Sequence, residues 1–419
     1  MNVSKFLYLF AALVTLNTYS DVFEVFPLYE TPPIDSRGDA ADDPAIWINK
    51  EFPALSIIFA TDKRSGIYAY DLRGSQITFS PAGNINNVDL RTFKLDYTTD
   101  NGVVKKDYTF LFGSNRSLNT IDLWIFFDEG IHKSMQYRAR EKNSEYVNNL
   151  SLRYSKFSIN EKPDFRIKSE SNIYGICAGV HPKYGLIAFV TEDQGSNVEV
   201  YYLSANGLEL LATLDNGGES EGCVFDDENL TLFISEENLR GNLKAHKFDE
   251  DFNLIGEPFF IDSREGNIVG DPEGVTVYKT DQNEGFIILS SQGDSKFNIY
   301  NRQQPYEFIK SFKISSTEGI DGVSDTDGID AVSVNLNCDF DFESSTDNNS
   351  KSRIEEEEEN SEFWLNIFVE GYLKDKCDDY PNGILVVQDG YNYLGDKKEN
   401  QNFKLISFKE ILDNLDVTR

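Results

Sequence analysis

Clusters of Asp and Glu recur along this chain of 419 residues, each beside an apolar segment. Carboxylates that are brought close together either take up protons or bind cations. Hard divalent cations, calcium above all, accept six to eight oxygen ligands in loose geometry. If folding gathers these clusters in one place, the chemistry there depends on a bound cation. The segments are DDPAIWIN, NNVDLRT, YGICAGV, EGCVFDD, DPEGVTVY and DTDGIDAV, from residues 42, 86, 174, 221, 271 and 325.

Softer metals and single-loop calcium sites do not fit this sequence. The three histidines, His132, His181 and His246, are isolated and have no ligand spacing. The segment DTDGID (Asp325–Asp330) resembles the start of an EF-hand loop, but its glycine comes too early and no closing glutamate follows. A calcium site must therefore draw its ligands from several segments.

A second set of candidate residues is cationic. Lys63 and Arg64 lie in TDKRSG, and Arg116 lies in GSNRS. Cations beside a calcium-loaded acidic rim suit a phosphorylated ligand, because arginine makes forked contacts to phosphate oxygens. Taken singly, each of them is better explained as a solvated surface residue.

The elements that position these residues are predicted to be strands. Six stretches repeat a buried strand, a polar loop, an alternating strand, a turn and a further strand, several of them about 45 to 55 residues apart. Each is preceded by one of the six segments quoted above. The pattern predicts an all-β fold, a six-bladed β-propeller, with helix only in short pieces such as FKEILDNL near the end. A tandem of β-sandwiches is the alternative.

In a propeller the first strand of each blade lines the central channel. The starts of the six segments, five of which carry Asp or Glu, are therefore expected to meet at one end of that channel, although they are scattered over some three hundred residues of sequence. The formal net charge of −32 agrees with bound cations. It argues against nucleic acid and against anionic membranes as partners, because both require a basic face.

The first twenty residues read as a secretory signal peptide. Lys5 precedes the apolar run FLYLFAALVTL, and Thr18 and Ser20 are small residues before Asp21. A membrane anchor is the alternative, but the run is short for a bilayer. We expect residues 1–20 to be removed and residues 21–419 to form one exported domain, secreted or periplasmic, that is monomeric and not membrane-bound.

Four cysteines fit an oxidising compartment. Cys177 and Cys223 have similar local surroundings, which places them at like positions of neighbouring units. Cys338 and Cys377 bracket an acidic insertion at about 335–380 that contains IEEEEEN. Two disulfides, Cys177–Cys223 and Cys338–Cys377, are suspected; a metal-thiolate site lacks any CxxC spacing.

The motifs together resemble the β-propeller phytases, alkaline calcium-dependent enzymes that remove phosphates from myo-inositol hexakisphosphate (phytate). The likeness runs in order from Gly38 to Lys404, and the family fold is a six-bladed propeller. The resembling stretches are GDAADDPAIW, TDKRSG, NNVDLR, SNRS, EGCVFDDE, SEEN, DPEGVTVY, SSQGDSKFNIYNRQ, DGVSDTDGID, VVQDG and NQNFK.

The resemblance implies roles for individual residues. The implied calcium ligands of the cleavage site are Asp42, Glu221, Glu237, Asp271, Glu273, Asp321 and Asp327, with Asp39 added to the metal-binding set. Asp43, the Val88 carbonyl and Asp389 are implied ligands of more deeply seated calcium. Lys63, Arg64, Arg116 and Tyr174 are implied contacts to substrate phosphates. The residues expected to carry catalysis are Glu221, Asp271, Glu273, Asp327, Lys63 and Arg116.

The resemblance also implies a mechanism of the 3-phytase type. A water held by calcium attacks phosphorus directly, with no covalent enzyme intermediate, while the ions and Lys63 or Arg116 stabilise the charge of the transferring group. The substrate is expected as a calcium complex, and an adjacent site holds a neighbouring phosphate. The chain departs from the family at Asp193 in TEDQG, where a lysine is frequent, which weakens that adjacent site or shifts substrate preference.

Two other functions remain open at this point. A calcium-dependent propeller hydrolase of another class, such as a lactonase, would use one or two ions and would not need Lys63, Arg64 and Arg116. A calcium-stabilised binding propeller that has lost catalysis is the other, and Asp193 is compatible with it. Phosphate release from phytate separates the three.

Overall fold

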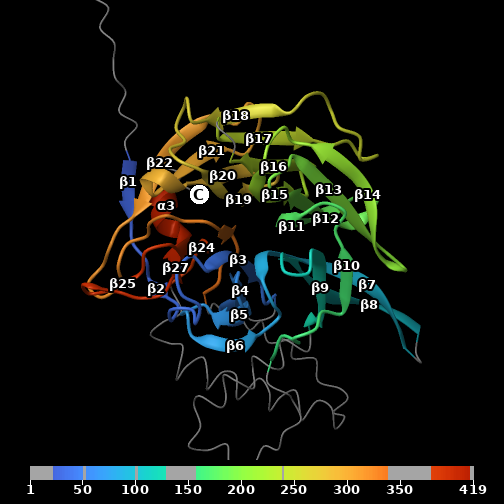
Figure 1. Cartoon of the computed structure of the whole chain (residues 1–419), viewed down its shortest axis with the longest axis horizontal. Helices are drawn as coiled ribbons and strands as arrows, with labels where there is room; N and C mark the ends of the chain where they lie inside the picture. Colours follow the sequence, from blue (N-terminus) through green and yellow to red (C-terminus); the bar gives the residue numbers. More distant parts are fainter. Residues whose placement is uncertain are drawn as a thin grey trace, which may run out of the picture.

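The computed structural model describes residues 22–50, 53–99, 102–128, 157–237, 240–337 and 379–415. Within these ranges the chain forms six main sheets arranged around a common axis (Figure 1). Each sheet has four antiparallel strands, and one sheet carries an additional strand at its edge. The predicted six-bladed β-propeller is confirmed, and the tandem of sandwiches is wrong.

The first three blades follow the chain in order. Blade 1 contains β3 (Ala41–Trp47), β4 (Ile57–Asp62), β5 (Gly66–Asp71) and β6 (Gln76–Ser80). Blade 2 contains β7 (Ile85–Thr99), β8 (Gly102–Asn115), β9 (Thr120–Phe127) and β10 (Phe165–Lys168). Blade 3 contains β11 (Ile173–His181), β12 (Gly185–Glu192), β13 (Asn197–Ser204) and β14 (Gly207–Asp215).

The other three blades complete the ring. Blade 4 contains β15 (Ser220–Asp226), β16 (Thr231–Glu236), β17 (Asn242–Lys247) and β18 (Phe259–Ser263). Blade 5 contains β19 (Pro272–Asp281), β20 (Glu284–Ser291), β21 (Lys296–Asn301), β22 (Phe308–Ile314) and, parallel to β22, β1 (Val22–Val25). Blade 6 contains β23 (Ile329–Val332), β24 (Ile384–Asp389), β27 (Asn402–Ser407) and, at its outer edge, β2 (Tyr29–Glu30).

The ring closes through its innermost strands and through the start of the described chain. Neighbouring innermost strands β3, β7, β11, β15, β19 and β23 contact one another in sequence, and β23 contacts β3. The early strand β2 pairs with the late strand β27, with Tyr29 opposite Leu405 and Glu30 opposite Lys404. This pairing holds the two ends of the described chain together, as full closure of a ring requires.

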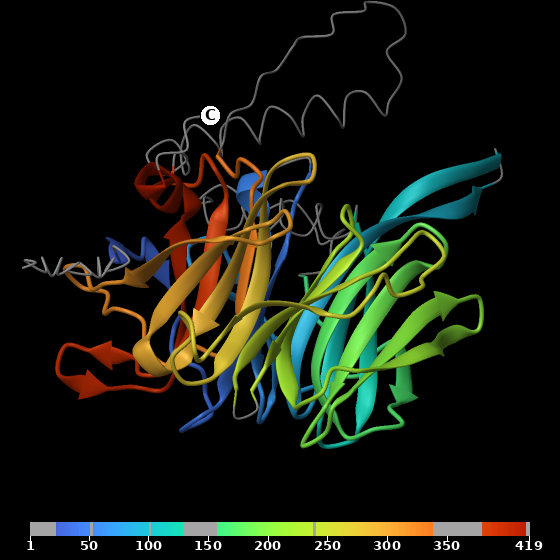
Figure 2. The same cartoon turned by 90° about the horizontal axis from the view of Figure 1, so that it is seen from above.

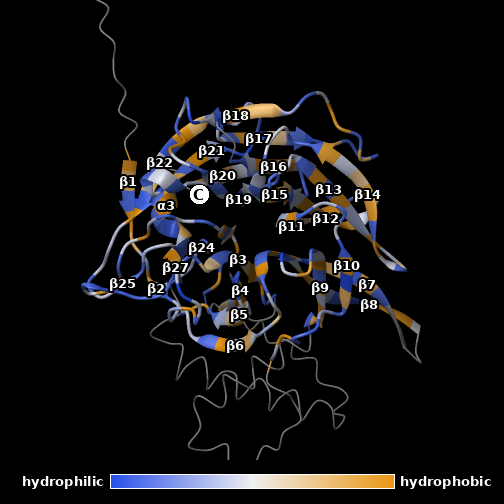
Figure 3. Ribbon diagram, viewed as in Figure 1, coloured by the Kyte–Doolittle hydropathy of each residue, from blue (hydrophilic) through white to orange (hydrophobic). Residues whose placement is uncertain are grey.

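The core of the protein lies between the blades. Six hydrophobic clusters of buried residues are each shared by two neighbouring sheets, and together they pass around the whole ring. Trp47 of blade 1 and Trp124 of blade 2, for example, belong to one cluster. Hydrophobic positions accordingly follow the strands, whereas the connecting loops are mainly hydrophilic (Figure 3). Such packing fixes each blade against its neighbours.

Three smaller elements and one disulfide complete the description. The helix α3 (Phe408–Asn414) confirms the predicted end segment, and short 3₁₀ turns occupy Pro53–Leu55 and Gln292–Asp294. Cys177 on β11 and Cys223 on β15 form the predicted disulfide, which joins blades 3 and 4.

Some predictions concern segments outside the described residues, namely residues 1–20, Cys338, Cys377 and nearly all of the insertion. The signal peptide, the second disulfide and the acidic insertion therefore stay predictions. No helix in the described part of the chain has the length and apolarity to cross a membrane.

Two hairpins extend beyond the blades. The long β7–β8 hairpin and the hairpin of β25 (Tyr393–Leu394) with β26 (Lys397–Lys398) project at opposite ends of the ring (Figure 2). The start of β7 leads into the predicted site, so the tip of the β7–β8 hairpin lies at the end of the ring away from that site.

Candidate functional site

A β-bulge interrupts five of the six innermost strands at the same place. From Ala41 to Pro44 the inner strand advances three residues, while its partner advances only two, from Asp62 to Ala60. Because a bulge inserts an extra residue, it re-aims the neighbouring side chains. The other four bulges lie between Ile85 and Val88, Ile173 and Ile176, Ser220 and Cys223, and Pro272 and Val275. The bulges span Asp42, Asp43, Tyr174, Glu221 and Glu273.

In blades 1 to 4 a Ser or Thr on the second strand supports the irregular backbone. Thr61 Oγ1 accepts a hydrogen bond from the Asp43 amide at 2.9 Å, and Thr191 Oγ1 accepts one from the Gly175 amide at 2.8 Å. Ser235 Oγ donates to the Gly222 carbonyl at 2.9 Å. Buried backbone groups that a bulge removes from the ladder need such partners. These residues were not predicted, although the repeated Ser or Thr at the end of the second strand was a usable signal.

Glycines after the candidate ligands let the innermost strands approach closely. A Cβ on Gly222 would lie 2.3 Å from the Glu273 carbonyl oxygen. A Cβ on Gly274 would lie 2.7 Å from the carbonyl oxygen of Asp327, to which the Gly274 amide donates a hydrogen bond at 2.8 Å. Each carboxylate is thus fixed by backbone contact with the next blade, and the acid–glycine pairs EG, EG and DG have a structural reason.

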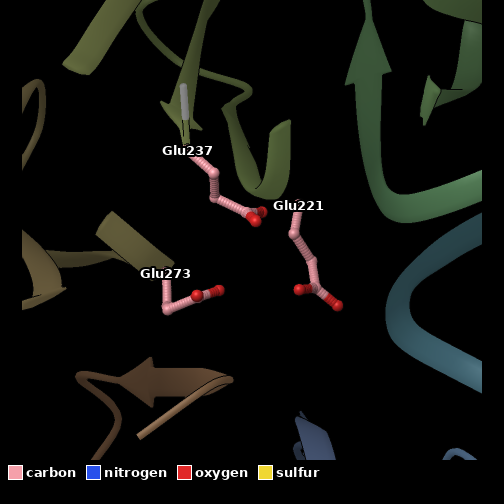
Figure 4. Close-up of side chains that lie close together, drawn as sticks. All are labelled: Glu221, Glu237 and Glu273. Atoms are coloured by element: carbon pink, nitrogen blue, oxygen red, sulfur yellow. The ribbon is translucent and has the colours of Figure 1, made fainter. Parts of the chain in front are cut away.

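Three glutamates from two blades converge at the mouth of the channel. Carboxylate oxygens of Glu221, Glu237 and Glu273 lie within 4.8 Å of one another. Figure 4 shows the three side chains pointing toward a common space. Glu221 and Glu273 are buried, and Glu237 is partly buried. The Asn86 side chain donates a hydrogen bond to Glu221 and was not predicted as a site residue.

Lys63 lies among three further carboxylates. Its Nζ is 2.8 Å from Asp39 Oδ1, 3.2 Å from Asp42 Oδ1 and 3.1 Å from Asp327 Oδ2. Asp42 and Asp327 are largely buried, whereas the Asp39 side chain is 68% exposed. Gln292 Nε2 donates to the other oxygen of Asp327 at 2.9 Å. The structure therefore brings Lys63 and the predicted ligands of blades 1 and 6 together.

Arg116 is held by three side chains. Its guanidinium lies over the Tyr174 ring, 4.8 Å from the centroid. Its Nη2 is 3.1 Å from Asp193 Oδ2, and its Nη1 donates to Asn86 Oδ1 at 3.3 Å. Asp193, the predicted departure from the family pattern, thus forms an ion pair with a predicted phosphate-binding residue. This pair reduces the charge that Arg116 presents to an anion.

Other predicted residues lie in separate groups. Asp321 pairs with the buried Lys404, whose Nζ also contacts Glu30 and lies 3.5 Å from Asp389 Oδ2. Asp321 therefore groups with Asp389 and not with the three converging glutamates. Asp271 forms an ion pair with Arg264 at the edge of the site. Neither Lys404 nor Arg264 was predicted to take part, because such ion pairs join residues of unrelated motifs.

Three further predicted residues are Asp43, Val88 and Arg64. Asp43 Oδ2 accepts a hydrogen bond from the Val88 amide at 3.1 Å, so these two residues adjoin, and calcium binding by Asp43 and the Val88 carbonyl stays a prediction. Arg64 is near the site, but its Nε donates to the Asp39 carbonyl at 2.9 Å. Arg64 is thus directed at the backbone of blade 1.

A cavity of about 480 Å³ opens beside these groups. The lining includes predicted residues from blades 1, 3, 4, 5 and 6 together with residues of the chain before and after the β25–β26 hairpin. The lining residues that bear on function are Asp39, Lys63, Tyr174, Glu221, Asp271, Glu273, Asp325, Asp327, Tyr391 and Lys398. The charges and the cavity thus occur in one place, as the propeller model predicted.

Burial and mutual repulsion strongly perturb the acids. Burial raises the pKa of Asp42 to about 7 and the pKa of Asp327 to about 7, although Lys63 opposes both shifts. Burial, followed by the Glu221 charge, raises the pKa of Glu237 to about 9. The same two causes raise the pKa of Glu273 well above its ordinary value. Acids that cost this much to ionise require a cation if all are to be charged near neutral pH.

The donor set fits calcium. Asp42 Oδ2, Glu237 Oε1 and Asp389 Oδ2 are buried without a hydrogen-bond partner. Buried polar atoms are normally satisfied, so orphaned carboxylate oxygens that adjoin other carboxylates indicate positions for a cation. All the candidate ligands are oxygens, which hard cations prefer. Residues Glu221, Glu237, Glu273, Asp42 and Asp327 are suited to hold such ions, whereas the Asp389 carboxylate already faces the Lys404 ammonium.

Comparison with known proteins agrees with this geometry. The family model described as Phytase matches residues 3–342. The chain is 29% identical over 395 residues to a 3-phytase of Bacillus subtilis, which covers 94% of this chain and 86% of that protein.

Two solved structures share only a distant likeness with the chain, and neither bears on function. A luciferin-regenerating enzyme is 10% identical to this chain; the match covers 90% of this chain and 96% of that enzyme's chain, with a TM-score of 0.46. A hydrazine synthase of Kuenenia stuttgartiensis is 10% identical and covers 68% of this chain and 76% of its own, with a TM-score of 0.40. The family match over most of the chain and the converging acidic site establish that this protein belongs to the phytase family of phosphoric monoester hydrolases.

Proposed function

We propose that the protein hydrolyses phosphate monoesters of phytate in a calcium-dependent reaction, releasing inorganic phosphate and lower inositol phosphates. The observation that carries the proposal is the convergence of Glu221, Glu237 and Glu273 beside one cavity that also holds Lys63 and Tyr174. An acidic cavity repels a polyanion unless cations reverse its sign. The B. subtilis relative, named a 3-phytase, supports this choice of substrate.

Calcium, when bound, would neutralise the carboxylates, attract the phosphate and make an attacking water more acidic. The chain's own contribution is to hold the ligands in place. The bulges aim the acids, and the glycines fix their backbones against the next blade. Such preorganisation removes the cost of gathering like charges during each turnover.

Lys63 contributes a positive charge at the site of cleavage. Its Nζ lies between the carboxylates of blades 1 and 6, and Lys63 itself lines the cavity. Burial lowers the pKa of Lys63, but the Asp42 and Asp327 charges outweigh it and raise the pKa. The ammonium therefore stays protonated across the working range of pH and can contact a phosphate oxygen throughout.

Arg116 and Tyr174 form the neighbouring part of the site. Stacking on the Tyr174 ring orients the planar guanidinium, and a planar guanidinium suits two oxygens of one phosphate. Asp193 accepts the hydrogen bond of Arg116 Nη2 in the free protein, so a phosphate that binds there must replace the Asp193 carboxylate.

We further propose that residues 1–20 direct export and that the mature protein acts outside the cytoplasm.

Phosphate release from phytate tests the proposed function directly. The wild type should release phosphate with calcium and none after chelation. Lys63→Met should lose at least about tenfold in kcat/KM, because a charge-assisted contact to the transferring group is removed. Lys183→Met is the matched control, since Lys183 forms an exposed pair with Asp251 and should leave the rate unchanged. Equal rates with and without calcium would refute the proposal.

A further inference from the structure

The segment around the β25–β26 hairpin forms one wall of the cavity. Five of its residues line the cavity, namely Gly390, Tyr391, Lys398, Glu399 and Gln401. The proposed reaction assigns no step to any of them. Figure 2 shows the hairpin projecting at one end of the ring, and Tyr391 and Lys398 are exposed.

Lys398 differs from Lys63, the other lysine of the cavity. Lys63 Nζ has three carboxylates within 3.2 Å. Lys398 Nζ lies over the Tyr391 ring, 4.2 Å from the centroid, and no carboxylate of the described residues is within ion-pair distance of it. The adjacent Glu399 is already paired, with Lys397 Nζ at 2.5 Å. A ring face holds an ammonium without using its hydrogen-bond donors, so Lys398 can still donate to an anion.

The backbone fixes the place of this lysine. Lys398 pairs with Tyr393 across the hairpin, and the Tyr393 amide donates to Asp321 Oδ2 at 2.6 Å. The Glu399 amide donates to the Asn392 carbonyl at 3.0 Å. The hairpin is thus attached to blade 6, and binding an anion at Lys398 costs little ordering of the backbone.

We propose that Lys398 and Tyr391 form a phosphate subsite for a group of the substrate that is not being cleaved. The inference rests on the proposed function. A substrate with several phosphates places one of them at the acidic centre and must accommodate the others along the cavity walls. On the Arg116 side Asp193 pairs with the guanidinium and takes part of its positive charge. On the other side the nearby Asp325 hydrogen-bonds to Tyr391, and no carboxylate of the described residues forms an ion pair with Lys398. The subsite therefore selects polyphosphorylated substrates over simple phosphate monoesters.

Two matched variants of the hairpin test the subsite. Lys398→Met should raise KM for phytate about five- to tenfold, with kcat changed less than twofold, since one charge-assisted contact outside the reacting group is lost. For p-nitrophenyl phosphate, which has a single phosphate, kcat/KM should not change. Lys397→Met, one residue away and paired with Glu399, should behave as the wild type with both substrates. Equal KM values for phytate in the two variants would overturn the subsite.

A binding measurement separates this inference from the proposed function. Calorimetric titration with myo-inositol hexasulfate, which has no phosphate to cleave, should show about five- to tenfold weaker binding to Lys398→Met than to Lys397→Met. Failure of the wild type to release phosphate would refute the proposed function, and this titration would still decide on the subsite. Equal affinities of the two variants would refute the subsite even in an active enzyme.

Discussion

The amide of Gly274, the residue after Glu273, donates a hydrogen bond to the carbonyl of Asp327 at 2.8 Å, so that β19 and the segment before β23 meet at two of the candidate ligands. A Cβ at Gly274 would lie 2.7 Å from that carbonyl oxygen and 2.7 Å from the Ile329 amide nitrogen. Both neighbours are backbone atoms and cannot move aside by changing a rotamer.

Gly274→Ala should therefore displace Glu273 from the other two glutamates. We expect phosphate release to fall at least about tenfold, because a misplacement of about 1 Å is enough for such a loss. Val275→Ala on the same strand is the control, since it removes buried apolar volume at a residue that does not line the site cavity. It should lower thermal stability and leave kcat nearly unchanged. Wild-type activity in a folded Gly274→Ala protein would contradict the role of this contact.

The Arg116–Asp193 pair should limit affinity for the substrate. Asp193→Asn removes the charge that neutralises Arg116, so KM for phytate should fall about two- to fivefold, the range of a partly exposed ion pair. Steady-state kinetics at fixed calcium measure the change. Asp251→Asn, which breaks the exposed Lys183 pair, should leave KM as it is. An unchanged or higher KM for Asp193→Asn would show that the pair does not oppose binding.

The Cys177–Cys223 disulfide should contribute strongly to stability. It joins the innermost strands of blades 3 and 4 across a sequence separation of 46 residues. Constraining a loop of that length in the unfolded chain is worth about 4 kcal/mol in the chain-entropy model. The double variant Cys177→Ser, Cys223→Ser should unfold at a lower urea concentration than the wild type. Its free energy of unfolding should be smaller by about 4 kcal/mol. Coincident unfolding curves for the variant and the wild type would contradict this.

Without divalent cations the protein should become less stable as the pH rises. Burial raises the pKa values of Asp42 and Asp327 from 3.8 to about 7, so these carboxyls bind protons more tightly in the folded than in the unfolded chain. Folding is therefore favoured at low pH, and this contribution is lost between about pH 4 and pH 7. The melting temperature of metal-free protein should be higher at pH 5 than at pH 8, and calcium should restore it at pH 8. A melting temperature that rises with pH in the absence of calcium would be inconsistent with these shifts.

The parts of the fold that depend on local pattern were predictable. Alternation of apolar and polar residues identified the strands, and closure of six repeats into a ring brought Asp42, Glu221, Glu273 and Asp327 to one end. The approach of Glu221 to Glu273 follows from topology, because each stands at the same position of its blade, whereas Glu237 follows the second strand of blade 4.

The parts of the fold and of the site that depend on contacts between distant, non-repeating residues were not predictable. The two-residue strand β2 carries too little pattern to show that it closes blade 6 against β27. The pairs Lys404–Asp321 and Arg264–Asp271 depend on side-chain reach, which sequence spacing does not report. The bulges insert one residue without changing the apolar pattern, so only the acid–glycine pairs and the repeated Ser or Thr hinted at them.

Calorimetric titration of metal-free protein with calcium tests most directly whether the converging carboxylates form a cation site. The wild type should bind calcium, and the double variant Glu237→Gln, Glu273→Gln should lose at least one binding event, because two of the three clustered ligands no longer carry charge. Glu257→Gln, an exposed substitution, should reproduce the wild-type isotherm. Identical isotherms for the wild type and the double variant would contradict the account.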